Sequence, residues 1–586
     1  MFRILSQIWR LMALCISGPG GKVGLVLFVV VVTLDLGSVY ASVRLIEWTG
    51  AFYGALEKVD AEEAVRQVGI FGIIVALNSA RHLLGQYVRK HLEMRWRRTL
   101  TQKALDIWLA NKAYWHLATS TYPHWNDTTN GPRGHHIDNP DQRIAEDCRL
   151  FLEGLLTEAL DFISRVVGLF SYIALLWSLA SFPLSLAFIG LPVEIPHYMI
   201  WAAFIYVAIS SLLTHVLGFP LKGLIVEQQR REANFRFALA RLRSNFEEVA
   251  LIGGEAAERR EFQSRFDAIV GNWRKLVNRD LILGCFTYPF NHSVLRIPLF
   301  VALPGYLAGH VAFGGLMQLS SAFSNVVTTL SWFVFSYRDL ADLVAASSRL
   351  DGFLQAAGSA GSQRPAIERA PSPDGNLHAG ALAIRSPEGK PIIAVGAFSA
   401  GRGETIWLRG PSGLGKTTLL KAIAGLWPYG EGRIELPEAG LMFSPQRPYF
   451  PIGDIYSAVA YPEPVDAYSR EELENVLRQV GLAHRIGVEF GRSDTREGHG
   501  LSGGEQQRLI LARVILHKPD WVLLDEPTSA LDTDAEAELL ALLRASLVGS
   551  TIVIVAHRQL RGLDDVRTIN LKNRPAATPR PTLQPA

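Results

Sequence analysis

The sequence predicts a chain of two parts, a six-helix transmembrane domain followed by a soluble α/β domain. Residues 1–345 contain nearly all of the long apolar runs, whereas residues 380–575 alternate short apolar strands with helical segments. The total of 586 residues is enough for several domains. We therefore expect a transmembrane domain over 1–350, a linker over 351–379, an α/β domain over 380–575 and a disordered tail over 576–586.

Six segments of the first part are long and apolar enough to cross a membrane, which takes roughly 20 residues. One contains VGLVLFVVVVTLDLG, which is apolar on every face, whereas a soluble core helix keeps a polar face. Basic residues follow the second and fourth segments, in YVRKHLEMRWRR and KGLIVEQQRREANFRFALARLR, and an excess of Lys and Arg marks the cytoplasmic side. Both ends of the domain are therefore expected in the cytoplasm. The predicted spans are about 23–46, 64–88, 154–180, 198–220, 282–308 and 319–342.

Composition argues against two classes of function. The net charge is only +3, and no basic stripe with interleaved aromatic residues is present, so no nucleic-acid partner is expected. The three cysteines (Cys15, Cys148 and Cys285) are scattered and match no metal-binding or disulfide spacing.

The first motif of the second part with a predicted chemical role is a phosphate-binding loop. GPSGLGKTT follows the strand-like ETIWLRG and precedes the helix-like TLLKAIAGLW. Glycines let backbone N–H groups approach phosphates, and a helix N-terminus favours negative charge. Lys416 would reach the β- and γ-phosphates of ATP, and the Thr417 hydroxyl would bind Mg²⁺. The predicted nucleotide-binding residues here are Gly410, Ser412, Gly413, Gly415, Lys416, Thr417 and Thr418.

A second group of candidates follows a buried strand. WVLLDEPTSALD ends its apolar run in Asp525 and Glu526, and the segment LSGGEQQR lies a helix length before it. Asp525 is placed to hold the Mg²⁺ shell, and Glu526 to orient or deprotonate the attacking water. His557 ends another apolar strand, TIVIVAHR. A histidine at a strand end is more often structural. Here the phosphate loop, the LSGGEQQR segment and the Asp525–Glu526 pair occur in the same domain, and they favour a catalytic role.

These motifs, in this order and spacing, resemble one half of an ABC transporter. The resemblance identifies Gln446 in FSPQRPYFP as the Q-loop, a catalytic and Mg²⁺-binding residue, LSGGEQQR as the signature, SALD with Asp532 as the D-loop, and His557 as the switch histidine. It implies an exporter-type membrane domain and two chains that bind ATP between the phosphate loop of one and the signature of the other. Ser502, Gly503 and Gly504 would contact that ATP. ALAIRSPEGKPI lacks the aromatic residue that often stacks on adenine, so the adenine site stays unassigned.

Three further stretches resemble the ABC subfamily D of peroxisomal acyl-CoA transporters, and its bacterial BacA-like branch in particular. They are RWRRTLT, DNPDQRIAEDCRLF and GGEAAERREF. The resemblance implies that residues 135–148 and about 245–262 are cytoplasmic elbows that touch the ATPase domain. A plain solvated connector is the alternative for 135–148.

The sequence thus predicts an ATP hydrolase coupled to transport, working as a homodimer with Mg²⁺ in the lipid of the bacterial inner membrane, with its ATPase domain in the cytoplasm. Its cargo is expected to be hydrophilic, such as antimicrobial peptides or cobalamin-like solutes, and uptake is the expected direction. A lipid or fatty acyl-CoA transporter and a membrane-tethered regulatory ATPase are the alternatives. Charged residues in the spans favour a hydrated cavity, because unpaired charge in lipid is costly, although simple ion pairs would also explain them. These residues are Asp35, Arg44, Glu47, Arg81, Glu158, Asp161, Arg165, His292 and Arg296.

Overall fold

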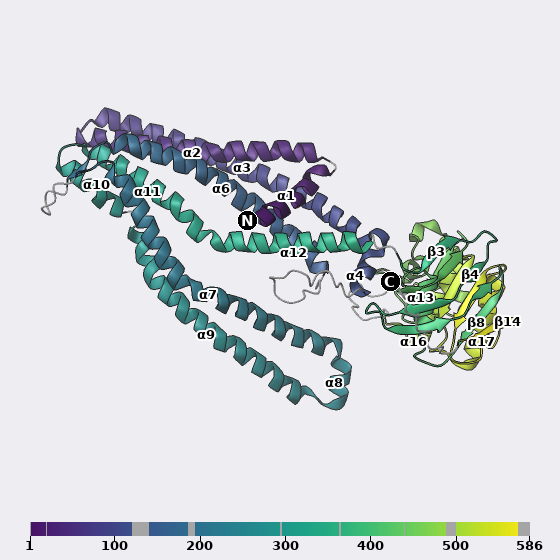
Figure 1. Ribbon diagram of the computed structural model, residues 1–586. Coiled ribbons are helices and arrows are strands. Elements are labelled where there is room, and N and C mark those ends of the chain that lie inside the picture. Colours follow the sequence, from purple (N-terminus) through teal and green to yellow (C-terminus); the bar gives the residue numbers. More distant parts are fainter. Residues whose placement is uncertain are drawn as a thin grey trace, which may run out of the picture. The chain divides into compact units, whose positions relative to one another are not determined.

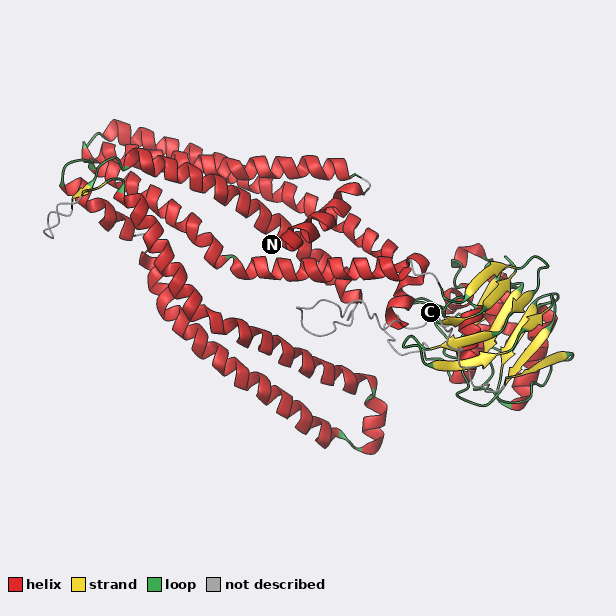
Figure 2. Cartoon of the chain, viewed as in Figure 1, coloured by secondary structure: helices red, strands yellow, loops and turns green. Residues whose placement is uncertain are grey.

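The structure is a computed structural model of the chain. It describes residues 2–18, 20–119, 140–185, 194–293, 296–361, 365–438, 440–487 and 500–571, so the predicted tail 576–586 lies outside the described residues. The chain divides into two compact units. Figure 1 gives the elements, and Figure 2 shows that one unit is nearly all helical while the other mixes strands with helices. The helical unit comprises Met1–Leu109 and Ile137–Ala356, and the mixed unit comprises Ala110–His136 and Ala357–Ala586.

The helical unit is built from long helices whose outer faces are apolar over part of their length. Helices α2 and α3 pack against each other, and α6 and α11 lie against α2. Large apolar side chains such as Val26, Phe170 and Phe219 are more than half exposed, as expected of helices that face lipid rather than water. The helices of this unit are α1 (Phe2–Ser17), α2 (Gly21–Glu57), α3 (Ala61–Leu109), α5 (Pro140–Gln142), η3 (Arg143–Asp147), α6 (Cys148–Leu179), α7 (Tyr198–Ser244), α8 (Phe246–Ile252), α9 (Glu255–Ser293), α10 (Ile297–Leu307), α11 (Phe313–Phe335) and α12 (Tyr337–Gly361), and a small hairpin joins β1 (Leu184–Ser185) to β2 (Glu194–Ile195).

The number of continuous spans differs from the prediction of six. Within the described residues, four helical stretches are long and apolar enough to cross a membrane, and they contain the first four predicted spans. The fifth predicted span is divided between α9 and α10, and the sixth between α11 and α12. Pro298 lies in the first turn of α10, the position that a residue without a backbone N–H favours, so a new helix starts there. The four stretches are Gly21–Glu57, Ala61–Thr119, Pro140–Leu179 and Tyr198–Ser244.

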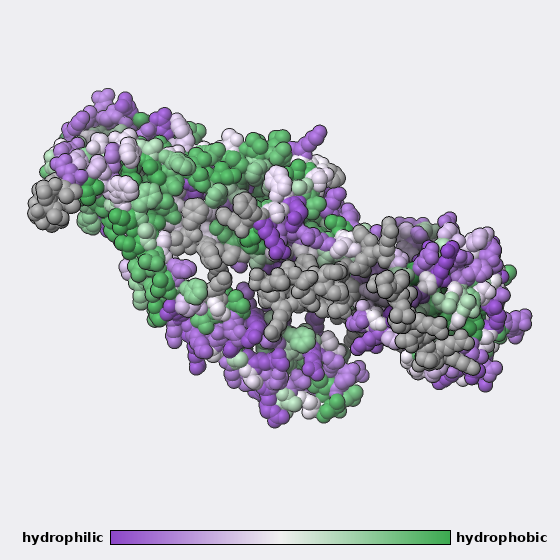
Figure 3. Space-filling model, viewed as in Figure 1, coloured by the Kyte–Doolittle hydropathy of each residue, from purple (hydrophilic) through white to green (hydrophobic). Residues whose placement is uncertain are grey.

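Helices α7 and α9 run side by side and are joined by the short helix α8 (Figure 1). Their halves near α8 are largely hydrophilic, whereas their other halves are hydrophobic (Figure 3). Asn272 ties the hydrophilic halves together, because its Nδ2 donates to Leu224 O at 3.0 Å and to Gln228 Oε1 at 2.9 Å. The pair therefore continues as a helical hairpin beyond the apolar region.

The segment 351–379, which the sequence predicts to be a linker, contains the boundary between the two units after Ala356 and is largely built of regular secondary structure. Helix α12 continues to Gly361, and strands β3 (Glu368–Pro371) and β4 (Leu377–Ala379) occupy much of the rest. Phe353, Ala357 and Ala360 are buried at helical spacing, so the small residues that suggested a linker form a packed helix face.

The mixed unit has a five-stranded parallel sheet in the order β11-β12-β13-β8-β14. All five residues of β12 and of β13 are buried, which explains why both strands read as unbroken apolar runs. Two smaller sheets, β3-β10-β4-β7 and β6-β5-β9, complete the unit. Its remaining elements are η1 (Ala110–Lys112), α4 (Ala113–Thr119), β5 (Leu382–Arg385), β6 (Pro391–Val395), β7 (Phe398–Ala400), β8 (Thr405–Arg409), α13 (Lys416–Ile423), β9 (Gly430–Glu431), β10 (Arg433–Leu436), β11 (Leu441–Ser444), α14 (Ile455–Ala460), η5 (Val465–Ala467), α15 (Arg470–Gln479), η6 (Ala483–Arg485), α16 (Gly503–His517), β12 (Trp521–Asp525), α17 (Thr533–Ser546), β13 (Thr551–Val555) and β14 (Val566–Asn570).

Candidate functional site

The predicted site residues follow the carboxyl ends of four neighbouring parallel strands. Gly410 follows β8, Gln446 lies two residues beyond β11, Glu526 follows β12 directly, and His557 lies two residues beyond β13. Because these strands are parallel and adjacent, their carboxyl ends lie at one edge of the sheet. Ligands bind at this edge in open α/β sheets. The order of the strands therefore brings together residues that are up to 147 positions apart in the chain, from Gly410 to His557.

The phosphate loop joins β8 to α13 with a tight turn. Gly413 and Gly415 have φ of 77° and 95°, a region that other residues rarely adopt, and a β-carbon at Gly415 would lie 2.6 Å from Ile392 Cγ2. Lys416 is buried, and its Nζ donates to the carbonyl oxygens of Gly410 and Pro411 at 2.9 and 3.0 Å. The ammonium group is thus held across its own loop, next to the N-terminus of α13.

Asp525 offers a place for a divalent cation. Only 1% of this residue is exposed, and within the described residues neither carboxylate oxygen has a hydrogen-bond partner. Burial raises the pKa of Asp525, the Thr417 hydroxyl opposes that rise, and the charge of Glu526 adds to it. A buried carboxylate without a partner is costly, and Mg²⁺ prefers oxygen ligands such as a carboxylate and a hydroxyl. Asp525 and Thr417 therefore fit the Mg²⁺ role predicted for them.

Glu526 is held between the other two predicted catalytic residues. Gln446 Nε2 donates to Glu526 Oε2 at 2.8 Å, and His557 Nε2 lies 2.7 Å from Glu526 Oε1. Glu526 has φ of 51°, and its backbone N–H still donates to Val555 O at 2.9 Å. The donation by the Gln446 amide nitrogen leaves its Oε1 as a possible ligand for Mg²⁺. The carboxylate is therefore aimed by two neighbours, as a general base must be.

The signature segment forms the start of α16. Ser502 caps this helix, its Oγ accepting from the N–H of Glu505, and Gly503 and Gly504 are the first helical residues. Their backbone N–H groups are among those that a helix leaves unpaired at its N-terminus, which suits an anion.

Asp532 has a local role in the structure, although it was predicted to contact nucleotide. Its Oδ1 accepts from Ala535 N at 2.8 Å, so Asp532 caps α17. The neighbouring D-loop residues are tied to α16, because Gln507 Nε2 donates to Ser529 Oγ and Gln507 Oε1 accepts from Ala530 N, each at 2.8 Å. The contact of Asp532 with nucleotide stays a prediction.

Sequence reasoning missed the contribution of residues 110–119. These residues group with the mixed unit, and the Trp115 side chain of α4 contributes to the docking there. Trp115 Nε1 donates to Leu426 O at 2.9 Å, and Lys421 Nζ lies 5.2 Å from the centre of the Trp115 ring. Lys421 belongs to α13, the helix that begins at the phosphate loop, so α4 is linked directly to an element of the site. The sequence did offer one signal for this docking, namely a tryptophan, Trp115, in a polar connecting segment.

The predicted elbow 135–148 is described only from Pro140 onward, and this part belongs to the helical unit. Asp147 is 2% exposed and pairs with Arg143 at 2.9 Å and with Arg349 of α12 at 2.6 Å. The polar character of the stretch is thus partly explained by packing inside the helical unit. The second predicted elbow, 245–262, covers α8 and the start of α9.

Comparison with known proteins decides the family. Residues 11–303 match the model of the ABC transporter transmembrane region 2, and residues 396–529 match the ABC transporter model. The chain is 34% identical over 555 residues to the inner membrane ABC transporter ATP-binding protein YddA of Escherichia coli, which covers 93% of this chain and 94% of that protein.

The chain belongs to the ABC transporter family.

Two further relatives are members of the D family. The transporter is 26% identical to the human lysosomal cobalamin transporter ABCD4, over 87% of this chain and 85% of that protein. It is also 26% identical to the chloroplastic ABC transporter D family member 2 of Arabidopsis thaliana, over 87% and 78%. The transporter thus combines a transmembrane region with an ATPase domain in one chain, and it hydrolyses ATP to drive transport. Half-transporters of this family are typically dimeric.

Proposed function

We propose that the chain is a homodimeric transporter of the bacterial inner membrane that uses ATP and Mg²⁺ to take up hydrophilic compounds such as peptides or cobalamin-like solutes. Six spans would place both ends and the ATPase domain in the cytoplasm. The observation that carries the proposal is a cluster of ionisable side chains shared by three apolar helices of the transmembrane unit.

The cluster is formed by α2, α3 and α6. Asp35 of α2 interacts electrostatically with Arg81 and Arg89 of α3 and with Asp161 of α6. Arg81 also donates from Nη1 to Leu34 O at 2.5 Å, which joins α3 to α2. Asp35 lies near the middle of the first apolar helix, so the group is not confined to a helix end.

Glu158 adds a further acid to this cluster, near Asp161 and Arg89. Only 6% of this residue is exposed, and its Oε2 has no hydrogen-bond partner among the described residues. Membrane-embedded charges are costly and mark solute or ion pathways by default. A path lined by such groups suits a hydrated, polar cargo better than an acyl chain.

The relatives support the same class of cargo. The human relative is named a lysosomal cobalamin transporter, and cobalamin is a large polar solute. The membrane of the Escherichia coli relative is the inner membrane, which supports the proposed location.

The homodimer is inferred from what one chain holds. The sequence has one phosphate loop and one signature, so two copies would complete two ATP sites.

At the tip of the α7–α9 hairpin, Leu251 and Ile252 of α8 are 80% and 83% exposed. We infer that α8 docks with these two side chains on an ATPase domain of the partner.

Sided transport tests the proposed cargo. Purified protein in liposomes is given ATP and Mg²⁺ on the side of the ATPase domain. A labelled peptide or cobalamin is placed on the opposite side of the membrane, and a labelled acyl-CoA replaces it in parallel samples. We expect ATP-dependent movement of the hydrophilic solute, loss of movement in Lys416→Ala, and a strong reduction in Asp35→Asn. Movement of acyl-CoA alone would favour the lipid or acyl-CoA alternative. ATPase activity without movement of any solute would favour the regulatory ATPase.

A further inference from the structure

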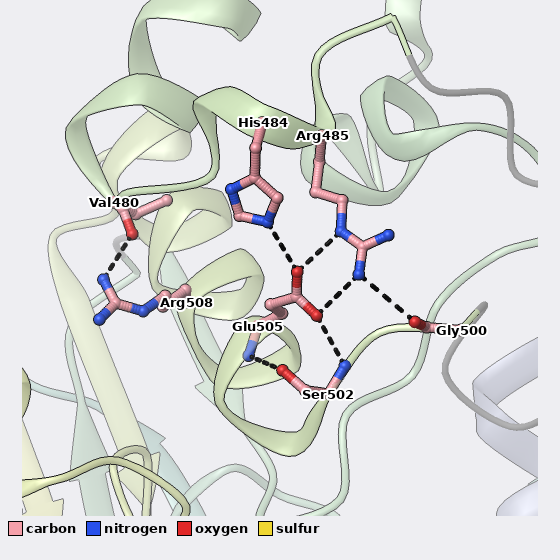
Figure 4. A network of polar contacts seen from close by, with 7 residues as sticks. All are labelled: Val480, His484, Arg485, Gly500, Ser502, Glu505 and Arg508. Carbon is pink, nitrogen blue, oxygen red and sulfur yellow. Dashed lines mark hydrogen bonds and ion pairs between the residues drawn. The ribbon is translucent and has the colours of Figure 1, made fainter.

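A network of polar contacts surrounds the start of α16, the signature helix, and the proposed function gives it no role (Figure 4). Glu505 is the third residue of α16 and lies in the same helical turn as Gly503 and Gly504. Its Oε2 accepts from Ser502 N at 2.8 Å, and its own N–H donates to Ser502 Oγ at 3.3 Å. These two bonds form a capping box, which satisfies two backbone donors at the start of the helix.

The capping box places a negative charge where the site needs to attract one. A carboxylate in the first turn stabilises a free helix N-terminus. The same carboxylate would repel the phosphates of an ATP molecule that approaches the N–H groups of this turn. An acid here is compatible with anion binding only if its charge is balanced nearby.

Arg485 supplies that balance from another element. Its Nε donates to Glu505 Oε1 at 2.7 Å and its Nη2 to Glu505 Oε2 at 2.9 Å, so the pair is bidentate. The two side chains are 26% and 15% exposed, which limits screening by water. Arg485 lies in η6, 20 residues before Glu505, and its Nη2 also reaches Gly500 O at 3.5 Å, just before the signature. Figure 4 shows the guanidinium group facing the carboxylate from the side opposite the helix start.

His484 takes part at the edge of the same network. Its Nε2 lies 2.9 Å from Glu505 Oε1, and its side chain is 61% exposed. Arg485 chiefly, then His484 and Ser502, hold the pKa of Glu505 far below its usual range, so this carboxylate is ionised throughout the neutral range. The need for a partner charge is therefore permanent.

We propose that Arg485 is a positioning residue for ATP hydrolysis: it neutralises Glu505 and holds the capping box, so that Ser502, Gly503 and Gly504 can receive the γ-phosphate of an ATP bound to a second copy of the chain. The inference deepens the ATPase site and rests on the proposed homodimer. The Ser502 hydroxyl fits this role, because its oxygen accepts the N–H of Glu505 while its hydrogen stays available for a phosphate oxygen.

The test compares four variants of the full-length protein: Arg485→Ala, Glu505→Gln, the double variant, and Arg478→Ala as a matched control. Arg478 pairs with Glu474 on the surface of α15, at 2.7 Å, and touches neither the signature nor the phosphate loop. In Arg485→Ala we expect the KM for ATP to rise about tenfold or more, the scale for breaking a partly buried charge pair. ADP affinity should change less than about twofold, because ADP lacks the γ-phosphate and binds the intact phosphate loop.

The double variant separates positioning from general damage. Glutamine at 505 keeps an acceptor for the capping box but carries no charge. If Arg485 acts by neutralising Glu505, the double variant should recover most of the lost affinity for ATP. A double variant as impaired as Arg485→Ala, or a single variant with unchanged KM, would overturn the inference.

A final measurement distinguishes an error in the role of Arg485 from an error in the proposed homodimer. In the Glu526→Gln background, a distance measurement between spin labels on the ATPase domains of the two copies, with and without ATP, reports closure of these domains. If Glu526→Gln shows no ATP-dependent closure, the two-copy arrangement is wrong. If it closes, and Arg485→Ala with Glu526→Gln closes at the same ATP concentration, only the role of Arg485 is wrong.

Discussion

His557 and Glu526 meet across the carboxyl ends of β13 and β12, with His557 Nε2 2.7 Å from Glu526 Oε1. Gln446 donates to the other carboxylate oxygen at 2.8 Å from beyond β11. Three strands thus converge on one acid, the residue that the sequence predicts to accept a proton from the attacking water.

The first prediction concerns this acid. Glu526→Gln keeps the shape of the side chain but removes the base, so hydrolysis should fall by about 10²–10⁴-fold. ATP binding should persist, because the phosphate loop and Lys416 are unchanged. Steady-state ATPase assays and equilibrium binding of ATP measure the two effects on the same preparation. Near-normal turnover would exclude Glu526 as the base.

Asp525 leads to a prediction about the metal. Removal of Mg²⁺ with a chelator should stop hydrolysis, and Asp525→Asn should raise the Mg²⁺ concentration for half-maximal activity about tenfold or more. The reason is that the carboxylate is buried and that, apart from the nearby Thr417 hydroxyl, its oxygens lack a hydrogen-bond partner among the described residues, so they can take a cation. A titration of ATPase activity with Mg²⁺ measures the shift. Unchanged Mg²⁺ dependence in the variant would contradict the assignment.

Trp115 leads to a prediction about coupling. Trp115→Ala removes both the bond to Leu426 O and the contact with Lys421, so α4 should lose its hold on the C-terminal end of α13. Basal ATPase activity should stay within about threefold of the wild type, whereas stimulation by cargo should be lost. Trp115→Phe keeps a ring and should retain part of the stimulation. Full stimulation in Trp115→Ala would mean that α4 is only a connector.

The elbow 135–148 leads to a second prediction about coupling, which needs a measurement of stability beside it. The double variant Asp141→Ala with Arg143→Ala should uncouple the ATPase from transport if this stretch docks on an ATPase domain. Because Arg143 also pairs with buried Asp147, thermal unfolding must be measured beside transport. Wild-type rates of transport in the double variant would show that the stretch does not transmit closure.

Glu505 leads to a prediction about pH. Its pKa is lowered in the folded state, so its contribution to stability is fully present above the ordinary carboxyl pKa of about 4.5 and is lost as the pH falls below that value. The difference in thermal midpoint between wild type and Glu505→Gln should therefore persist from about pH 8 to 5.5 and shrink below about pH 4.5. A difference that is already gone at pH 6 would contradict the ion pair with Arg485.

The sequence alone determined the two-part organisation and the chemistry of the ATPase. Motifs such as GPSGLGKTT and WVLLDE combine backbone geometry with residue types that few other sites need, so they predict roles without a structure. Apolar runs likewise reveal membrane helices, since about 20 mostly apolar residues in sequence have few other uses.

Tertiary structure decided what depends on contacts between distant residues. The break between α9 and α10, the helical face of α12 in the expected linker, and the docking of Trp115 on α13 are set by packing partners that no local pattern reveals. The pairing of Arg485 with Glu505 is of the same kind. Twenty residues separate the two charges in the chain, and only the fold shows which of several nearby acids and bases meet.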